Sequence, residues 1–134
     1  MKRMLLVPLL ALACGSSSAA EVWRCTNQDF EAHCSADGCT VNDDAFTPMD
    51  VLVSREGYVF FCMYSGCWEG QGKVLQTGRH LSVHAEALEW TPDVNESGET
   101  AEGAILVDTQ DLHALLSING YAQPLACRVL EGET

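Results

Sequence analysis

The stretch that decides the fold of this chain is residues 58–75, YVFFCMYSGCWEGQGKVL. Its first six residues are apolar on both faces of an extended strand, which predicts a central strand with packing on each side. Residues 64–66 are typical of a turn, and Gly66 can adopt a positive φ without a steric clash. We therefore predict that the chain reverses here and returns as a second strand over residues 68–76.

One face of the return strand carries few side-chain atoms, because Gly70 and Gly72 lie on it together with Trp68. Glycine inside a strand indicates a bend, a bulge or the close approach of another backbone. The simplest interpretation is the corner of a barrel. The alternative is the floor of a groove, with Trp68 as one of its walls.

The first twenty residues predict an export signal. Two basic residues follow Met1, residues 4–13 form an apolar run too short to cross a bilayer, and residues 14–20 are small. We expect cleavage after Ala20, which leaves residues 21–134 as a single exported domain, periplasmic or secreted. No transmembrane helix would remain in the mature chain.

A second interpretation of the same segment is a lipoprotein signal. Residues 11–14, ALAC, resemble the lipobox of bacterial lipoproteins, in which the cysteine becomes lipidated. Cys14 would then carry the lipid anchor of an envelope protein, and residues 15–20 would form a tether to the domain. The sequence leaves both export routes open.

The exported chain would be strongly acidic. Removal of residues 1–20 leaves five Lys and Arg against nineteen Asp and Glu, a net charge of −14. Such a surface disfavours nucleic acids and anionic membranes as partners. It is compatible with a basic protein partner, with cations, or with charge that only keeps the protein in solution.

The cysteines predict a disulfide framework. Six remain without Cys14, and an even number in a small exported domain indicates three disulfides and an oxidising compartment. Two C-x-x-x-G-C segments let the chain fold back on itself, and elimination leaves a third pair that joins the two ends. The predicted pairs are Cys34–Cys39, Cys62–Cys67 and Cys25–Cys127. A zinc site of four thiolates is the alternative, which the export signal disfavours.

Alternating apolar and polar residues predict further short strands. They cover residues 22–25, 49–54, 79–85, 104–107, 112–118 and 121–130. Residues 26–44 are polar and loop-like, with a small cross-linked hairpin at Asp37-Gly38, and Asn119-Gly120 is a strong hairpin signal. We predict an all-β fold, a small antiparallel β-barrel or sandwich of about seven to nine short strands, stabilised by disulfides.

Three patterns bear on metal binding. His80 and His84 would lie one turn apart on a helix, but on the predicted strand they lie ~13 Å apart. Residues 93–98, DVNESG, match part of a calcium loop, yet Ala104 stands where that loop carries a glutamate. Asn42-Asp43-Asp44 is more typical of a turn. We expect no metal site and no cofactor, and keep a divalent-metal-binding protein as an alternative.

The sequence contains none of the common catalytic motifs. G-x-S-x-G, H-E-x-x-H and a phosphate-binding glycine loop are absent, and oxidised cysteines would provide no thiolate nucleophile. One candidate is Glu69, a carboxylate beside Trp68 whose pKa a hydrophobic setting would raise. We predict no catalytic residues and a non-enzymatic protein, with an unrecognised hydrolase as an alternative.

The predicted turn carries the candidate binding residues Ser65, Trp68 and Glu69. A turn fixed by a disulfide loses little entropy on binding, and a Trp there can bury a large apolar area. Ser65-Gly66 also resembles the S-G-x-x-Y loop of the small periplasmic lysozyme inhibitors, which are exported, disulfide-bonded β-barrels whose loop enters the lysozyme cleft. Glu69 stands at the tyrosine position of that motif, and Trp68 lies one residue before it.

These observations predict an exported, disulfide-bonded β-domain that binds a basic protein or a small ligand. A lysozyme-inhibitor-like protein is the alternative that the resemblance implies.

Overall fold

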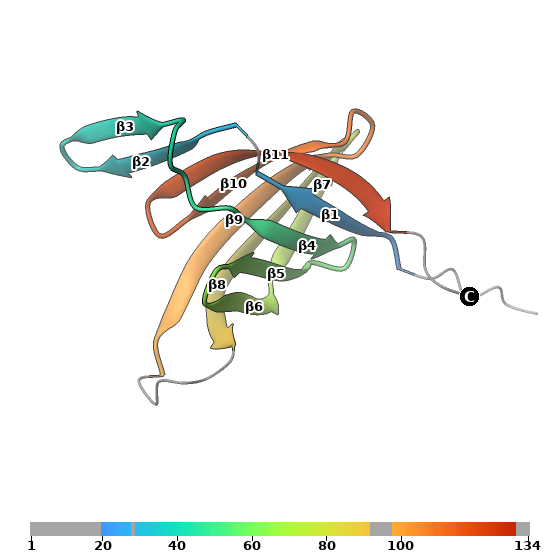
Figure 1. The fold of residues 1–134 in the computed structure, drawn as a ribbon. Coiled ribbons are helices and arrows are strands. Elements are labelled where there is room, and N and C mark those ends of the chain that lie inside the picture. Colours follow the sequence, from blue (N-terminus) through green and yellow to red (C-terminus); the bar gives the residue numbers. More distant parts are fainter. Residues whose placement is uncertain (1–19, 28, 92–97, 131–134) are drawn as a thin grey trace, which may run out of the picture.

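The computed structural model describes residues 20–27, 29–91 and 98–130, and these form an all-β fold (Figure 1). One antiparallel sheet contains all the strands, and no helix occurs among these residues. The strands are β1 (Val22–Thr26), β2 (Glu31–Ser35), β3 (Gly38–Asn42), β4 (Asp50–Ser54), β5 (Tyr58–Met63), β6 (Gly66–Gln71), β7 (Lys73–Thr77), β8 (His80–Thr91), β9 (Thr100–Asp108), β10 (His113–Ile118) and β11 (Tyr121–Leu130).

Eight of the strands close into a barrel, in the order β1, β4, β5, β6, β8, β9, β10 and β11. The barrel closes because β1 pairs with β4 along one edge and with β11 along the other. The first and last strands of the described chain therefore meet. The prediction of an antiparallel barrel is confirmed, and the sandwich alternative is not what forms.

The barrel interior is filled with apolar side chains that alternate along each strand, as expected for eight strands. On β8, Leu81 and Val83 are buried while His80 and His84 are exposed on the outer face, so the strand interpretation of this segment is confirmed. The largest fully buried side chains include Trp23, Phe61, Leu81, Leu88 and Ile105. These side chains therefore form a single packed core inside the barrel.

The prediction that β5 is packed on both faces is wrong. Val59 and Phe61 are fully buried, but Tyr58 on the opposite face is 44% exposed. A closed barrel has a single core, and only the inner face of each strand reaches it. On the outer face of β5, Tyr58 is therefore a surface residue and Phe60 is half-buried.

The closed barrel has eight strands, within the expected seven to nine, and three further strands lie outside it. The return strand is divided at Gly72 into β6 and β7, which pair with different parts of β8. Residues 26–44, expected to be mainly loop with a small hairpin at Asp37-Gly38, contain that hairpin as two five-residue strands, β2 and β3. None of β2, β3 and β7 belongs to the closed barrel.

Gly72 marks the bend that the glycine pattern predicts. Its amide donates a hydrogen bond to the carbonyl oxygen of Gly57, at 2.8 Å. A Cβ at this position would lie 2.6 Å from the Val83 side chain and 2.7 Å from the carbonyl oxygen of His84. Another backbone therefore approaches the thin face of the strand, which is why no side chain fits there.

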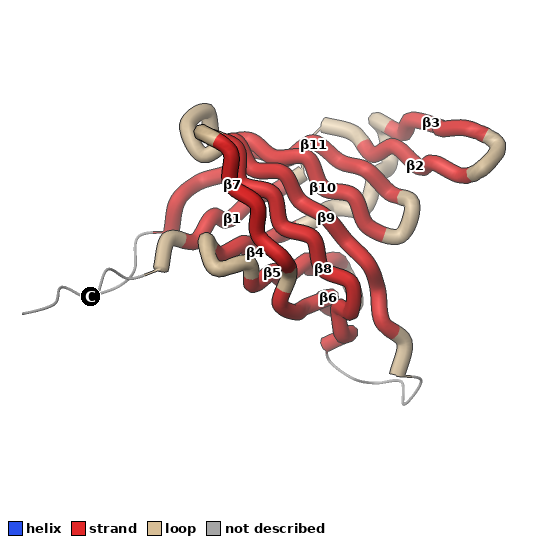
Figure 2. The backbone as a smooth tube through the Cα atoms, turned by 180° about the vertical axis from the view of Figure 1, so that it is seen from behind, coloured by secondary structure: helices blue, strands red, loops and turns tan. Residues whose placement is uncertain are grey.

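The β2–β3 hairpin projects beyond the barrel (Figures 1 and 2). It continues along the edge of β11 that β1 leaves free, through the pairs Tyr121↔His33 and Ala122↔Ala32. The amide of Cys34 also donates to the carbonyl oxygen of Gly120 at 2.8 Å. The hairpin is thus joined to the barrel over a short stretch at one end of β11.

The three disulfides join residues that lie directly opposite each other on neighbouring strands. Cys25–Cys127 links β1 to β11, Cys34–Cys39 links β2 to β3, and Cys62–Cys67 links β5 to β6. These are the pairs that the cysteine spacing suggested. Three disulfides in a small β-barrel are typical of proteins in a non-cytoplasmic, oxidising compartment.

The predicted export signal, the lipidation site Cys14 and most of the calcium-like segment 93–98 lie outside the described residues.

Within the described part of the chain, no helix is long and apolar enough to cross a membrane.

Candidate functional site

The three predicted binding residues do not form one site. Ser65 lies exposed in the turn between β5 and β6. Trp68 faces the core, opposite Phe61, and packs edge-to-face on Trp90 with ring centroids 5.0 Å apart. Glu69, the next residue, points to the other side of the sheet. The structure therefore separates Trp68 from the two polar residues.

Glu69 is held by hydrogen bonds on the outer face of the barrel. Its carboxylate accepts one from the Thr91 hydroxyl and one from the Tyr58 hydroxyl, each at 2.6 Å. The bond from Thr91, followed by that from Tyr58, lowers the pKa of Glu69 below its ordinary value. The expectation of a raised pKa is wrong, because hydroxyls from β5 and β8 surround the carboxylate instead of an apolar setting.

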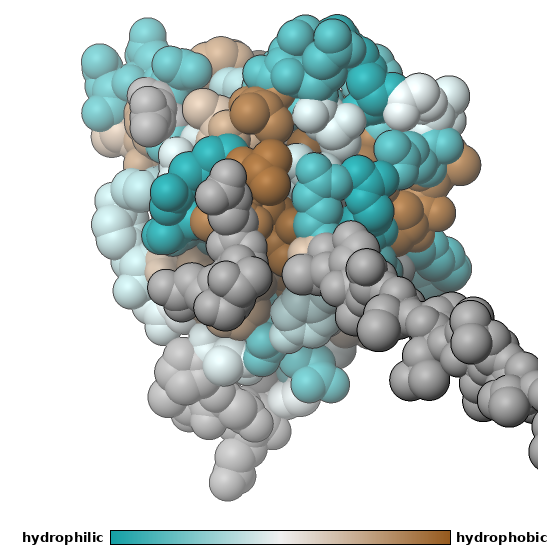
Figure 3. Space-filling view, turned by 90° about the vertical axis from the view of Figure 1, so that its right-hand side faces the viewer, coloured by the Kyte–Doolittle hydropathy of each residue, from teal (hydrophilic) through white to brown (hydrophobic). Residues whose placement is uncertain are grey.

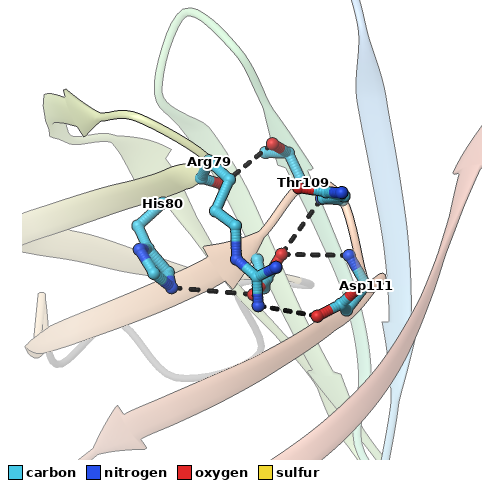
Figure 4. Close-up of polar contacts among 6 residues, drawn as sticks. Arg79, His80, Thr109 and Asp111 are labelled. Carbon is cyan, nitrogen blue, oxygen red and sulfur yellow. Dashed lines mark hydrogen bonds and ion pairs between the residues drawn. The ribbon is translucent and has the colours of Figure 1, made fainter.

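A second polar cluster lies where the β7–β8 turn meets the β9–β10 turn (Figure 4). Asp108 at the end of β9 is only 3% exposed, and Arg79 bridges it to Asp111 with nitrogen–oxygen distances of 2.6 Å. His80 and His113 are its direct cross-strand neighbours, and Nε2 of His80 lies 3.6 Å from the carboxylate.

Asp108 stabilises the turn that follows it. Its Oδ1 accepts hydrogen bonds from the amides of Asp111 and Gln110, each at 3.0 Å. The amide of Asp111 is the main cause of a lowered Asp108 pKa, helped by Gln110, Arg79 and His113, while burial opposes the shift. The carbonyl of Arg79 accepts from Thr109 as well, so the cluster ties two turns together. We interpret it as a structural cluster.

In the described ranges, no group of three or more His, Cys, Asp or Glu side chains is arranged to hold a metal ion. Asn42 instead forms a turn, in which its Oδ1 accepts a hydrogen bond from the amide of Ala45 at 3.1 Å.

A further candidate site is a groove on the outer surface of the barrel, which we call the outer groove. Its volume is about 480 Å³. The floor is the outer face of β8 to β11, and one wall is formed by Phe30, which directly precedes β2, and by Ala32 on β2. The lining residues are Phe30, Ala32, Ser82, His84, Ala104, Ile105, Leu106, Leu115, Leu116, Ser117, Ala122, Gln123 and Pro124.

The floor of the outer groove comes from a row of cross-strand partners. Leu75 on β7 is followed across the sheet by Ser82, Leu106, Leu115 and Pro124, one residue from each strand. Leu106 is 40% exposed and Leu115 is 57% exposed. Outer positions of a barrel strand are ordinarily polar, so three apolar neighbours in one row form an unusual strip.

The sequence contains a signal for this strip that the alternation analysis missed. Residues 104–107, AILV, and 114–118, ALLSI, are nearly continuous apolar runs instead of strict alternations. Such runs are typical of strands that are covered on both faces. Figure 3 shows hydrophobic side chains that reach the surface at its right-hand edge, the side of the barrel that faces the reader in Figure 2.

The outer groove continues into a more polar pocket of about 380 Å³, which we call the polar end. His84, Ala104 and Ser117 line both. The polar end adds Glu86 and Glu102, together with the β10–β11 turn at residues 119–120. Glu86 forms an ion pair with Lys73 at 2.8 Å. The combined site thus has an apolar middle and an acidic end.

Comparison of the chain with protein-family models, with curated proteins and with solved structures finds no match.

Proposed function

We propose that this chain is a non-enzymatic binding protein, exported to the periplasm or secreted, that holds an apolar group of its ligand in the outer groove. The observation that carries the proposal is the exposure of Leu106 and Leu115, directly opposite each other on the outer face of neighbouring strands. They lie beside Phe30, which is 39% exposed. A contiguous apolar strip on a soluble domain is typical of an interaction site.

The packing of the barrel supports a site on its outside. Trp23, Phe61 and Leu88 fill the interior, so an apolar ligand finds its surface on the outer face of the strands. Covering the exposed part of Leu115 would contribute about 1–2 kcal/mol. The strands are fixed by the closed sheet, so little conformational entropy is lost when a ligand binds.

The polar clusters support a non-enzymatic function. The Glu69 carboxylate is occupied by Tyr58 and Thr91, and its pKa is lowered, which is the opposite of what a general acid near neutral pH requires. Asp108 is occupied by two amides and by Arg79. Both carboxylates thus have structural partners.

The binding proposal is tested with Nile red, a neutral apolar dye whose fluorescence rises in an apolar site. We expect saturable binding by the wild-type protein, and about tenfold weaker binding by Leu115→Asp. The matched control is Tyr64→Asp, because Tyr64 is 83% exposed in the β5–β6 turn and lies outside the groove. Equal binding by all three proteins would contradict the proposal.

The lysozyme-inhibitor alternative retains one supporting observation. Ser65 and Tyr64 are exposed in a turn that Cys62–Cys67 closes, so the loop could enter a cleft without reordering. The test is a muramidase assay with c-type lysozyme and the purified protein. Inhibition that Ser65→Asp abolishes, and Leu115→Asp leaves intact, would favour this function over the groove.

A further inference from the structure

The polar end of the outer groove lies in line with the apolar strip along β9. Along the outer face of β9, Leu106, Ala104 and Glu102 follow each other at every second residue. At ~3.4 Å per residue, Glu102 lies ~14 Å from Leu106, with the small side chain of Ala104 between them. An extended segment lying along β9 would repeat the same spacing, with an apolar residue at one position and a polar residue four positions away.

Glu102 is the carboxylate available to a ligand at this end. The neighbouring Glu86 is already paired with Lys73, whereas no Lys, Arg or His of the described residues lies within ion-pair distance of Glu102. Ser117 and Asn119 line the same pocket and can accept further hydrogen bonds. A Lys or Arg side chain would therefore meet an uncompensated carboxylate and these acceptors, beside the imidazole of His84 that lines the same pocket.

The overall charge points to the same kind of partner. Four of the five cations that the described ranges contain are already engaged, in the pairs Arg24–Asp50, Arg55–Glu21, Lys73–Glu86 and Arg79 with Asp108 and Asp111. The remaining carboxylates set up a negative field, which attracts a basic partner and repels an acidic one. A second copy of this chain, with a net charge of −12 for the full sequence, is disfavoured for that reason.

We infer that the outer groove binds an extended segment of a basic protein, with an apolar side chain over Leu106 and Leu115 and a Lys or Arg side chain beside Glu102. The inference rests on the proposed binding function and adds the chemistry of the partner. The segment it defines reads apolar-x-small-x-basic, in either chain direction, because the groove is open along the strands.

Synthetic peptides test this partner. The probes are blocked heptapeptides, Ser-Leu-Ser-Ala-Ser-Lys-Ser and its reverse, together with versions in which Lys is replaced by Gln or by Glu. Binding is followed by NMR shifts of the methyl groups of Leu106 and Leu115. We expect at least one Lys peptide to bind about threefold to tenfold more tightly than its Glu version, with the difference shrinking as salt is added.

Two variants test whether Glu102 causes the preference for the Lys peptide over the Glu peptide. Glu102→Gln should remove most of the preference for Lys over Glu, whereas Glu56→Gln should retain it. Glu56 is a matched control, because it is an exposed glutamate in the β4–β5 turn that lies outside both parts of the site. Equal losses in the two variants would mean that only the overall charge acts, and would overturn the assignment of Glu102.

The outcomes separate this inference from the proposed function. If Nile red binds in the groove but Lys, Gln and Glu peptides bind equally well, or none binds, the basic partner is wrong while the groove stands. If neither dye nor peptide binds, both are wrong. Concentration-dependent dimers in analytical ultracentrifugation that Leu115→Asp abolishes would show that a second copy occupies the groove, and would also overturn the inference.

Discussion

Cys25 on β1 lies directly opposite Cys127 on β11, with 4.0 Å between their Cα atoms, and the disulfide between them crosses the seam where the first and last strands of the barrel meet. These two residues are 102 positions apart in the sequence. The bond therefore closes covalently the same loop that the sheet closes with hydrogen bonds.

Removal of this bond should destabilise the barrel. In the chain-entropy description, a crosslink closing a loop of about 100 residues contributes about 4.7 kcal/mol, against about 2 kcal/mol for a loop of about six. We expect Cys25→Ala with Cys127→Ala to lower the free energy of unfolding by about 3–5 kcal/mol in urea titrations. Cys34→Ala with Cys39→Ala is the control, and an equal loss there would contradict the seam argument.

Trp68→Ala should behave as a core substitution. Trp68 packs against Trp90 and the barrel core, so truncation should cost about 2–4 kcal/mol, somewhat below a fully buried Trp. The free energy of unfolding from urea titrations measures the loss. The folded protein should still bind Nile red, because the outer groove does not include Trp68. Unchanged stability with lost binding would show instead that Trp68 contacts the ligand.

Asp108 makes stability depend on pH in the acid range. Its folded-state pKa is lowered from 3.8, so its contribution is fully present above that value and is lost as the pH falls through the folded-state pKa. Asp108→Asn should therefore lower the melting temperature at pH 7, and the difference from wild type should narrow as the pH falls below about 4. A difference independent of pH would contradict this assignment.

Gly72→Ala tests the bend between β6 and β7. The added Cβ would lie 2.7 Å from the carbonyl oxygen of His84, and a backbone atom in a barrel strand cannot move away cheaply. We expect a loss of about 1–3 kcal/mol in the free energy of unfolding, measured in urea. At Gly98, φ is +61° and, of the described residues apart from its chain neighbours, no atom lies within 4 Å of the added Cβ, so alanine should cost about 1 kcal/mol through backbone strain.

Much of the barrel could be predicted from local patterns. Alternation identified the buried face of β8, and Asn119-Gly120 forms the expected turn, with φ of 50° and 81°. The spacing of the cysteines suggested the three disulfides. The strands, the turn and the two local disulfides depend on residues close together in the sequence. The Cys25–Cys127 pair follows by elimination, because these are the two cysteines that remain.

The candidate site depends on strand neighbours, which local patterns do not give. Leu106 and Leu115 become a strip only because β9 and β10 pair in a register that places them opposite each other. Phe30 lines the same groove, although it lies more than seventy residues before Leu106 in the sequence. Glu69 likewise has a lowered pKa because Thr91, on another strand, donates to it.

The short attachment of the β2–β3 hairpin has a consequence for the outer groove. Two residue pairs with β11, one backbone hydrogen bond, the buried hydrogen bond from Gln123 to Glu31 and the ring contact of His33 with Tyr121 hold it to the barrel, while Cys34–Cys39 crosslinks its two strands. These contacts gather on residues 120–123, at one end of β11. Phe30 stands at the base of the hairpin, where the Asn27 side chain donates a hydrogen bond to its carbonyl oxygen at 3.0 Å. This wall of the outer groove is therefore set by the barrel end of the hairpin, and shortening the tip at Asp37 should leave it unchanged.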